Sequence, residues 1–240
     1  ACRTKILSNT KINIPRASLR QTQKFGLSGM ERKIRLDSPI NKRLVHVDEP
    51  SLKDVRSDLS RVIDGYEEKC NGTNLVADLS TIGKLTSVLR EGQWKVTVAT
   101  YADKEIISAF PGDTTNRGFG LAVDVGTTKV AAYLVDLLSG ETIDSLGAMN
   151  PQIAYGEDVI ARATTILTGS NNDIVLQRVI IDLLNQMILE ICVRNRISKN
   201  EILDMTVVGN TVMHHILTRL PLRQLAFAPY VPAVSDSLNV

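Results

Sequence analysis

The sequence predicts an α/β protein in which a small α+β domain precedes a larger α/β domain. Two observations carry this prediction. From Leu44 onward, short apolar runs alternate with segments of helical periodicity, and after residue 116 three consecutive strands are joined by very short turns. Such turns allow only antiparallel pairing, because a parallel connection needs a crossover of a dozen or more residues. A turn-rich joint, residues 111–116, separates the two domains.

Residues 1–42 have little predicted structure. Residues 11–14 alternate polar and apolar side chains and predict a short strand, which Pro15 ends. Residues 17–42 lack sustained periodicity and are predicted to be a linker. Residues 1–45 hold 11 Lys and Arg against two acidic residues, although the net charge of the chain is only +2. Such a segment is most often a solvated linker, with docking to an acidic partner as the alternative; the scarcity of stacking aromatics argues against nucleic acid.

The α+β domain is predicted over residues 43–115. A strand at 44–47 is followed by a helix that Pro50 and Ser51 open and that runs to about Lys69, with apolar residues at helical spacing from Leu52 and Val55 onward. A strand at 75–79, a helix from Ser80 to residue 90, and a hairpin of strands 93–101 and 105–110 complete it.

The larger domain is predicted over residues 117–240. Strands at 119–124, 129–136 and 141–148 form an antiparallel meander, which a Rossmann unit would not begin with. Helices at 157–167 and 173–195, a buried strand at 205–208 and a helix at 211–218 follow.

The loop between the first two strands of this meander is a candidate phosphate site. Gly126 lets the backbone turn closely around a phosphate, and the amides and hydroxyls of Thr127 and Thr128 can donate hydrogen bonds to it. Asp124, at the strand end, is suited to hold Mg²⁺ through its hydration shell, and Lys129 is a weaker candidate for a further phosphate contact. An ordinary type I′ hairpin is the alternative, which the strand–loop–strand–turn–strand context disfavours.

Two later segments narrow the interpretation: 150–162 (NPQIAYGEDVIAR) and 207–217 (VVGNTVMHHIL). Together with 120–129 (GLAVDVGTTK), which resembles the first phosphate motif of the superfamily of acetate and sugar kinases, Hsp70 and actin, they resemble the reductive activators of corrinoid enzymes. The resemblance covers the whole chain in order. It implies that residues 117–240 are the N-terminal part of an actin-like, ribonuclease H-like ATPase domain, of the superfamily abbreviated ASKHA.

Both segments contain candidate site residues. Asn150 and Gln152, beside Pro151, are predicted to face a cleft or a partner, whereas the acidic residues 157 and 158 fit a helix start. Asn210 and Thr211 follow a buried strand at the start of a helix, where an anion or a polar group of a partner can bind.

The resemblance implies ATP-dependent reductive activation of a corrinoid protein, Co(II) to Co(I), by an iron–sulfur electron-transfer protein. The implied cofactors are ATP with Mg²⁺ and, in the full-length protein, a 2Fe–2S cluster. The implied partner is a corrinoid protein or a corrinoid-dependent methyltransferase; the electron donor stays unspecified and a homodimer is permitted. Cys2, in the segment ACRT, resembles the fourth cysteine of the ferredoxin domain, and the resemblance implies that residues 1–16 are the end of that domain. The other three ligands are absent, so no cluster is expected in this chain.

Other features set the limits of these expectations. No window approaches the length of a membrane span, and neither a secretion signal nor a cysteine pattern for disulfides or zinc is present, so a cytoplasmic location is expected. A second phosphate loop and an adenosine-binding segment are not found before Val240, so the chain itself is expected to be an inactive fragment with a partial site. Two alternatives stay open, a sugar- or acetate-kinase-like phosphotransferase and a non-catalytic docking module.

Overall fold

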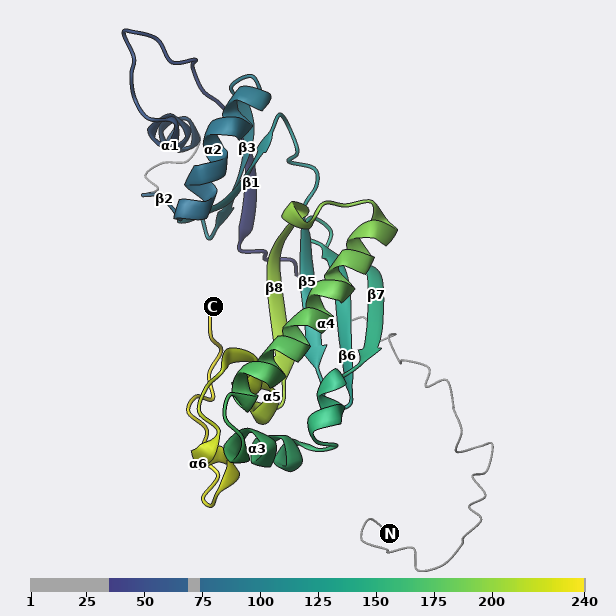
Figure 1. Cartoon of the computed structure of the whole chain (residues 1–240). Coiled ribbons are helices and arrows are strands. Elements are labelled where there is room, and N and C mark those ends of the chain that lie inside the picture. Colours follow the sequence, from purple (N-terminus) through teal and green to yellow (C-terminus); the bar gives the residue numbers. More distant parts are fainter. Residues whose placement is uncertain (1–34, 69–73, 240) are drawn as a thin grey trace, which may run out of the picture. The chain divides into compact units, whose positions relative to one another are not determined.

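The computed structural model describes residues 35–68 and 74–239, which form two four-stranded sheets, each with helices of its own (Figure 1). The predicted α/β class is confirmed. The predicted strand near residue 12, most of the predicted linker and Cys2 lie outside the described residues. In the described part of the chain, no helix is both long and apolar enough to cross a membrane.

The first sheet has the strand order β1-β3-β4-β2. Its strands are β1 (Ile40–His46), β2 (Val76–Ala77), β3 (Lys95–Tyr101) and β4 (Glu105–Pro111), and its helices are α1 (Asp58–Glu67) and α2 (Leu79–Glu91). The predicted β3–β4 hairpin is confirmed, and the short strand β2 pairs with β4 in parallel. Strand β1 begins at Ile40, inside the predicted linker, because Ile40 is buried and pairs with Tyr101 of β3.

Helix α1 begins at Asp58, eight residues later than Pro50, so the predicted start was wrong. Leu52 and Val55, predicted to lie on its apolar face, are 101% and 82% exposed. Instead of a helical turn, Ser51 and Asp54 exchange two backbone hydrogen bonds of 3.1 and 3.0 Å. These bonds close a tight turn over residues 51–54. The helical spacing of Leu52 and Val55 therefore does not correspond to a helix.

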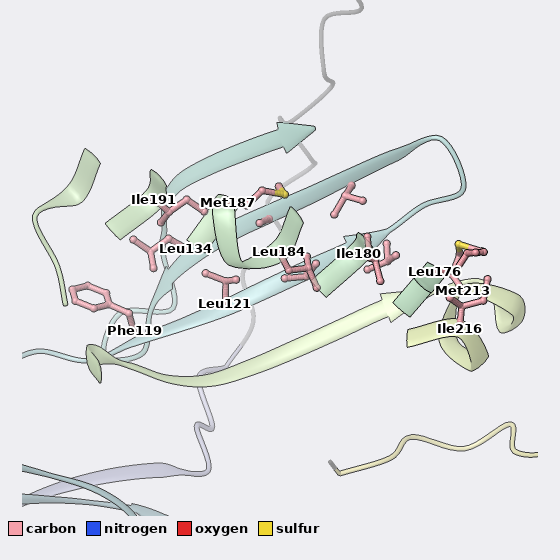
Figure 2. Close-up of a cluster of buried hydrophobic side chains, with 14 of the residues drawn as sticks. Phe119, Leu121, Leu134, Leu176, Ile180, Leu184, Met187, Ile191, Met213 and Ile216 are labelled. Atoms are coloured by element: carbon pink, nitrogen blue, oxygen red, sulfur yellow. The ribbon is translucent and has the colours of Figure 1, made fainter. Parts of the chain in front are cut away.

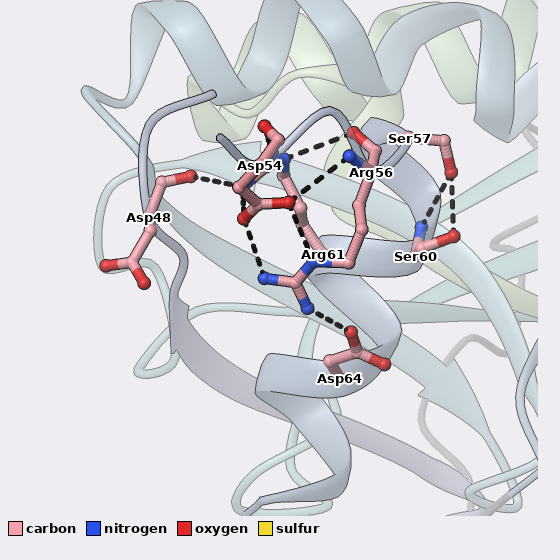
Figure 3. A network of polar contacts seen from close by, with 7 residues as sticks. All are labelled: Asp48, Asp54, Arg56, Ser57, Ser60, Arg61 and Asp64. Carbon is pink, nitrogen blue, oxygen red and sulfur yellow. Dashed lines mark hydrogen bonds and ion pairs between the residues drawn. The ribbon is translucent and has the colours of Figure 1, made fainter. Parts of the chain in front are cut away.

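The turn is fixed by a network of charged side chains (Figure 3). Buried Arg61 donates to the carbonyl oxygens of Asp48 and Asp54, at 3.1 and 2.6 Å, and to the Asp54 carboxylate at 2.8 Å. Hydrogen bonds from Arg56 hold the pKa of Asp54 well below its usual range. Ser57 then caps α1 by accepting the Ser60 N–H.

The second sheet has the order β7-β6-β5-β8, and β8 is parallel to β5. Its strands are β5 (Phe119–Val125), β6 (Lys129–Asp136), β7 (Thr142–Met149) and β8 (Ile202–Gly209). The predicted meander is therefore confirmed. The helical segments are η2 (Pro151–Tyr155), α3 (Val159–Thr168), α4 (Asn172–Asn195), η3 (Lys199–Glu201), α5 (Thr211–Thr218) and α6 (Arg223–Ala226).

Helix α4 supplies the core of this second unit. Its buried residues recur at helical spacing and pack against alternate residues of β5 and β6 (Figure 2). Those in this core cluster are Leu176, Ile180, Leu184, Met187 and Ile191. On β5 the core-facing residues are the odd-numbered ones, Leu121, Val123 and Val125. The Asp124 side chain therefore points to the opposite face of the sheet.

Strand β8 differs from its prediction. A buried strand was expected at 205–208, but β8 spans eight residues, and Met205 and Val208 are 46% and 58% exposed. The reason is its position at the edge of the sheet, where β5 is its one neighbour among the described strands. An apolar run alone does not distinguish such an edge strand from a central one.

We expect Ile180→Ala to lower the free energy of unfolding by about 2–5 kcal/mol, because Ile180 is fully buried against the sheet and the substitution leaves a cavity. Urea denaturation measures this change. Ile181→Ala is the matched control, since Ile181 is the next residue of α4 and is 39% exposed. Equal losses for both variants would contradict the packing of α4 described above.

Candidate functional site

The candidate site lies where β5 and β8 end side by side. The two parallel strands pair Asp124 with Val208 and Val125 with Gly209, so their carboxyl ends meet at one edge of the sheet. The loop 126–128 follows β5, and Asn210 follows β8. Asn210 Nδ2 donates to Thr127 Oγ1 at 3.0 Å, which joins the two segments. Carboxyl edges of α/β sheets are the usual place for ligands.

The loop presents the residues predicted for phosphate and Mg²⁺ binding. Asp124 and Thr128 are exposed, whereas Gly126, Thr127 and Lys129 are half-buried. A Cβ on Gly126 would lie 2.6 Å from the Lys129 carbonyl oxygen, a backbone atom that cannot move aside easily. Only glycine fits this turn.

Helix α5 begins beside the loop. The Asn210 side-chain oxygen accepts the N–H groups of Val212 and Met213, both at 3.1 Å, and so caps the helix. Asn210 therefore uses its carbonyl for the helix and its amide for the loop. Thr211, the first residue of α5, is exposed at the same edge.

The structure corrects the predicted cleft position of Asn150 and Gln152, since both side chains are buried. Asn150 Nδ2 donates to the Gly126 carbonyl at 2.8 Å, and its backbone N–H donates to the Thr128 carbonyl at 2.8 Å. Gln152 Nε2 donates to the Leu176 carbonyl of α4 at 2.9 Å. Both side-chain amides thus donate to backbone carbonyls of the chain itself and do not face a cleft.

Arg162 is the main residue that the sequence prediction missed. It is fully buried on α3, and its guanidinium donates to the carbonyl oxygens of Thr127 and Gly156 and to Gln152 Oε1. Burial lowers the pKa of Arg162. The signal in the sequence was an arginine within the apolar run of α3, an unusual place for a charge without a specific structural use.

The start of α3 agrees with its prediction. The Asp158 carboxylate accepts the Ala161 N–H at 2.7 Å and caps the helix. Gly156 precedes this cap, and a Cβ there would lie 2.7 Å from the Arg162 backbone nitrogen. The close turn at Gly156 brings its carbonyl within 2.9 Å of Arg162 Nε.

Comparison with known proteins identifies the family. Residues 119–240, about half of the chain, match the model of the RACo middle region, and residues 29–116 match that of the RACo linker region. The chain belongs to the RACo family. A curated relative, the "Corrinoid activation enzyme RamQ" of Eubacterium limosum, is 30% identical over 122 residues, which make up 51% of this chain and 21% of the relative.

A solved structure has a similar fold. The chain superposes on a "Reductive activator for corrinoid, iron-sulfur protein" with a TM-score of 0.69 and 30% identity, over 85% of this chain and 33% of the other. The RACo chain described here thus spans about a fifth to a third of the length of these two relatives.

Metal-binding side chains are not clustered in the part of this RACo chain that the structure describes. No group of three or more His, Cys, Asp or Glu residues there is placed to hold a metal ion. Cys2, the expected cluster ligand, lies outside the described residues. Cys192 on α4 is buried, and burial raises the pKa of its thiol.

We expect Cys192 to resist thiol reagents while the protein is folded, because it is shielded and because its raised pKa leaves little thiolate near pH 8, close to the pKa of about 8.5 of a free cysteine. A protein with Cys2→Ser and Cys70→Ser isolates this thiol, and the rate of reaction with a disulfide reagent measures its accessibility. The same protein in concentrated urea, which should react quickly, is the control. Fast labelling of the folded protein would contradict the buried position.

Proposed function

We propose that the protein carrying this chain is an ATP-dependent reductive activator that returns a corrinoid protein from Co(II) to Co(I). Membership of the RACo family supports this proposal, together with the printed names of two relatives, a corrinoid activation enzyme and a reductive activator for a corrinoid, iron–sulfur protein. The partner would be that corrinoid protein or a corrinoid-dependent methyltransferase, and a homodimer is compatible with it.

The observation that carries the nucleotide part of the proposal is the junction of the two strand ends. Asp124, Gly126, Thr127 and Thr128 follow one strand, Asn210 and Thr211 follow the other, and the Asn210–Thr127 hydrogen bond joins them. The Gly126 turn leaves no room for a Cβ, as expected of a loop that lies close around a phosphate. The residues present therefore fit ATP phosphates, and residues 117–240 would form the N-terminal part of the ATPase domain.

Each of these residues would make a different contact at this edge of the sheet. Thr127 and Thr128 would donate hydrogen bonds to the phosphate oxygens, with Lys129 as a further contact, and Asp124 would hold Mg²⁺ through water. Mg²⁺ would neutralise phosphate charge. The nucleotide can favour one conformation of the protein over another only if it binds that conformation more tightly. The reduction of cobalt would depend on this difference in affinity between the two conformations.

The electron would come from the iron–sulfur part of the longer protein. Cys2 is proposed as the last cysteine of its 2Fe–2S site and residues 1–16 as the end of that domain, followed by a connection over residues 17–42. Residues 43–115 are proposed as a separate α+β domain; they lie within the match to the RACo linker region, whereas residues 119–240 match the RACo middle region. The phosphotransferase and docking-module alternatives are not favoured, because the relatives found are activators of corrinoid proteins.

Asp124→Ala tests the proposal in the full-length protein. We expect MgATP affinity to fall roughly tenfold or more, as expected for removal of a charged ligand. ATP-dependent formation of Co(I), followed by its absorbance, should fall with it. Calorimetry measures the affinity.

Asp204→Ala is the matched control, because this substitution also removes one negative charge from the same sheet. Asp204 pairs with Gly120, near the other end of β5. Unchanged MgATP binding by Asp124→Ala, or an equal loss in Asp204→Ala, would refute the assigned site.

Gly126→Ala should also weaken MgATP binding, because the added Cβ would meet the Lys129 carbonyl at 2.6 Å and force the loop open. Gly83→Ala is the control, since a Cβ there meets nothing within 4 Å and alanine favours helix α2 by about 1 kcal/mol. Titration with MgATP measures the affinity of each variant, and thermal unfolding measures its stability. A Gly126→Ala protein with wild-type affinity would show that the close turn has no part in binding.

A further inference from the structure

Arg162 is a buried cation whose acceptors are all neutral. Its Nε donates to the Gly156 carbonyl at 2.9 Å, Nη1 to Gln152 Oε1 at 3.1 Å and to Met213 Sδ at 3.2 Å, and Nη2 to the Thr127 carbonyl. No salt bridge joins it to a carboxylate within residues 35–68 and 74–239. Burial lowers the pKa of Arg162, and the charge of Asp158 opposes that shift.

These contacts determine how two peptide units of the loop are oriented. A trans peptide is planar, so its C=O and N–H groups point in opposite directions. The Thr127 carbonyl points inward to Arg162, so the N–H of Thr128 in the same peptide points away from the buried guanidinium. The Gly126 carbonyl points inward to Asn150 Nδ2, so the Thr127 N–H likewise points away from the buried amide.

The two N–H groups are thus directed away from the interior by hydrogen bonds made within it. Successive backbone amides that point to one side form the type of concavity in which anions bind. The hydrogen bond from a guanidinium to the Thr127 carbonyl also polarises that peptide, which strengthens the Thr128 N–H as a donor.

The charge of Arg162 adds a second effect. Arginine keeps its charge in proteins, and a buried charge without an ion partner is unfavourable. Amide dipoles and a thioether surround this guanidinium, but they do not cancel its charge. A phosphate on the other side of the Thr127–Thr128 peptide would be attracted by this charge.

We propose that Arg162 is a positioning residue for the anion site: it fixes the Thr127–Thr128 peptide from behind and adds positive potential to the loop without touching the ligand. This inference rests on the proposed nucleotide function for its anion. Its structural part, the ordering of the loop, does not depend on any ligand.

Arg162→Lys in the full-length protein tests this inference, because lysine keeps the charge but cannot reach the three oxygen acceptors with one fork of donors. Without nucleotide, hydrogen exchange of the Asn150 backbone N–H, which donates to the Thr128 carbonyl and so reports opening of the loop (loop exchange), should accelerate about tenfold. MgATP affinity should fall by roughly tenfold, as expected when a charged hydrogen bond to the loop is lost. Arg162→Gln, which lacks the charge as well, should bind MgATP still more weakly.

Arg61→Lys is the matched control. Arg61 is the other buried arginine of the described chain that donates to backbone carbonyls, and it lies in the first sheet unit. The Arg61→Lys substitution should lower the unfolding temperature while leaving loop exchange and MgATP affinity as in the wild type.

Arg162 variants with wild-type loop exchange, or with a loss of affinity that Arg61→Lys shares, would overturn the inference. Loss of binding in Arg162→Lys but not in Asp124→Ala would reject the assigned Mg²⁺ site and keep the positioning role. If wild-type protein fails to bind MgATP, the proposed function fails, and with it the anion-site role of Arg162; loop exchange then decides only whether Arg162 orders the loop.

Discussion

The contact between the buried Arg162 guanidinium and the Thr127 carbonyl is the constraint around which the site is built. A guanidinium retains its charge when it is buried, so the fold has to surround it with acceptors. Here they come from the loop after β5, from Gln152 in η2 and from Gly156 before α3. Moving any one of these segments would leave a buried donor unsatisfied, and the loop conformation is therefore tied to the packing of η2 and α3.

The three sequence motifs that resemble a known family are one physical assembly. Asn150 and Arg162 lie 24 and 35 residues beyond the loop carbonyls that they bond, and Asn210 lies 83 residues beyond Thr127. The loop of the first motif lies at the surface, while the second motif supports it from the interior and the third joins it from the neighbouring strand. The third motif can join the first because β8 runs parallel to β5, so Asn210 follows β8 at the same edge where the loop follows β5.

The parts of the fold that sequence predicts well are those that local patterns determine. The periodicity of α4 and the short turns between β5, β6 and β7 leave few alternatives, and both were predicted correctly. The start of α1 was not, because Arg61 and Asp54 stabilise a turn through contacts that no periodicity records. Likewise, the residue types of Asn150 and Gln152 indicated a polar role, but only the three-dimensional packing shows that this role is internal.

The same distinction explains why the sequence suggested the surface residues of the candidate site but not the buried arginine behind them. Asp124, Thr127 and Thr128 belong to residue types that bind phosphate and Mg²⁺, so chemistry alone suggests them. Arg162 acts through the backbone of another residue, and its use depends on which carbonyl it reaches. A loop of this kind without buried donors behind it could rotate its peptides and lose the direction of its amides. In the proposed nucleotide site, the orientation of Thr127 and Thr128 would thus be a property of the interior as much as of the loop.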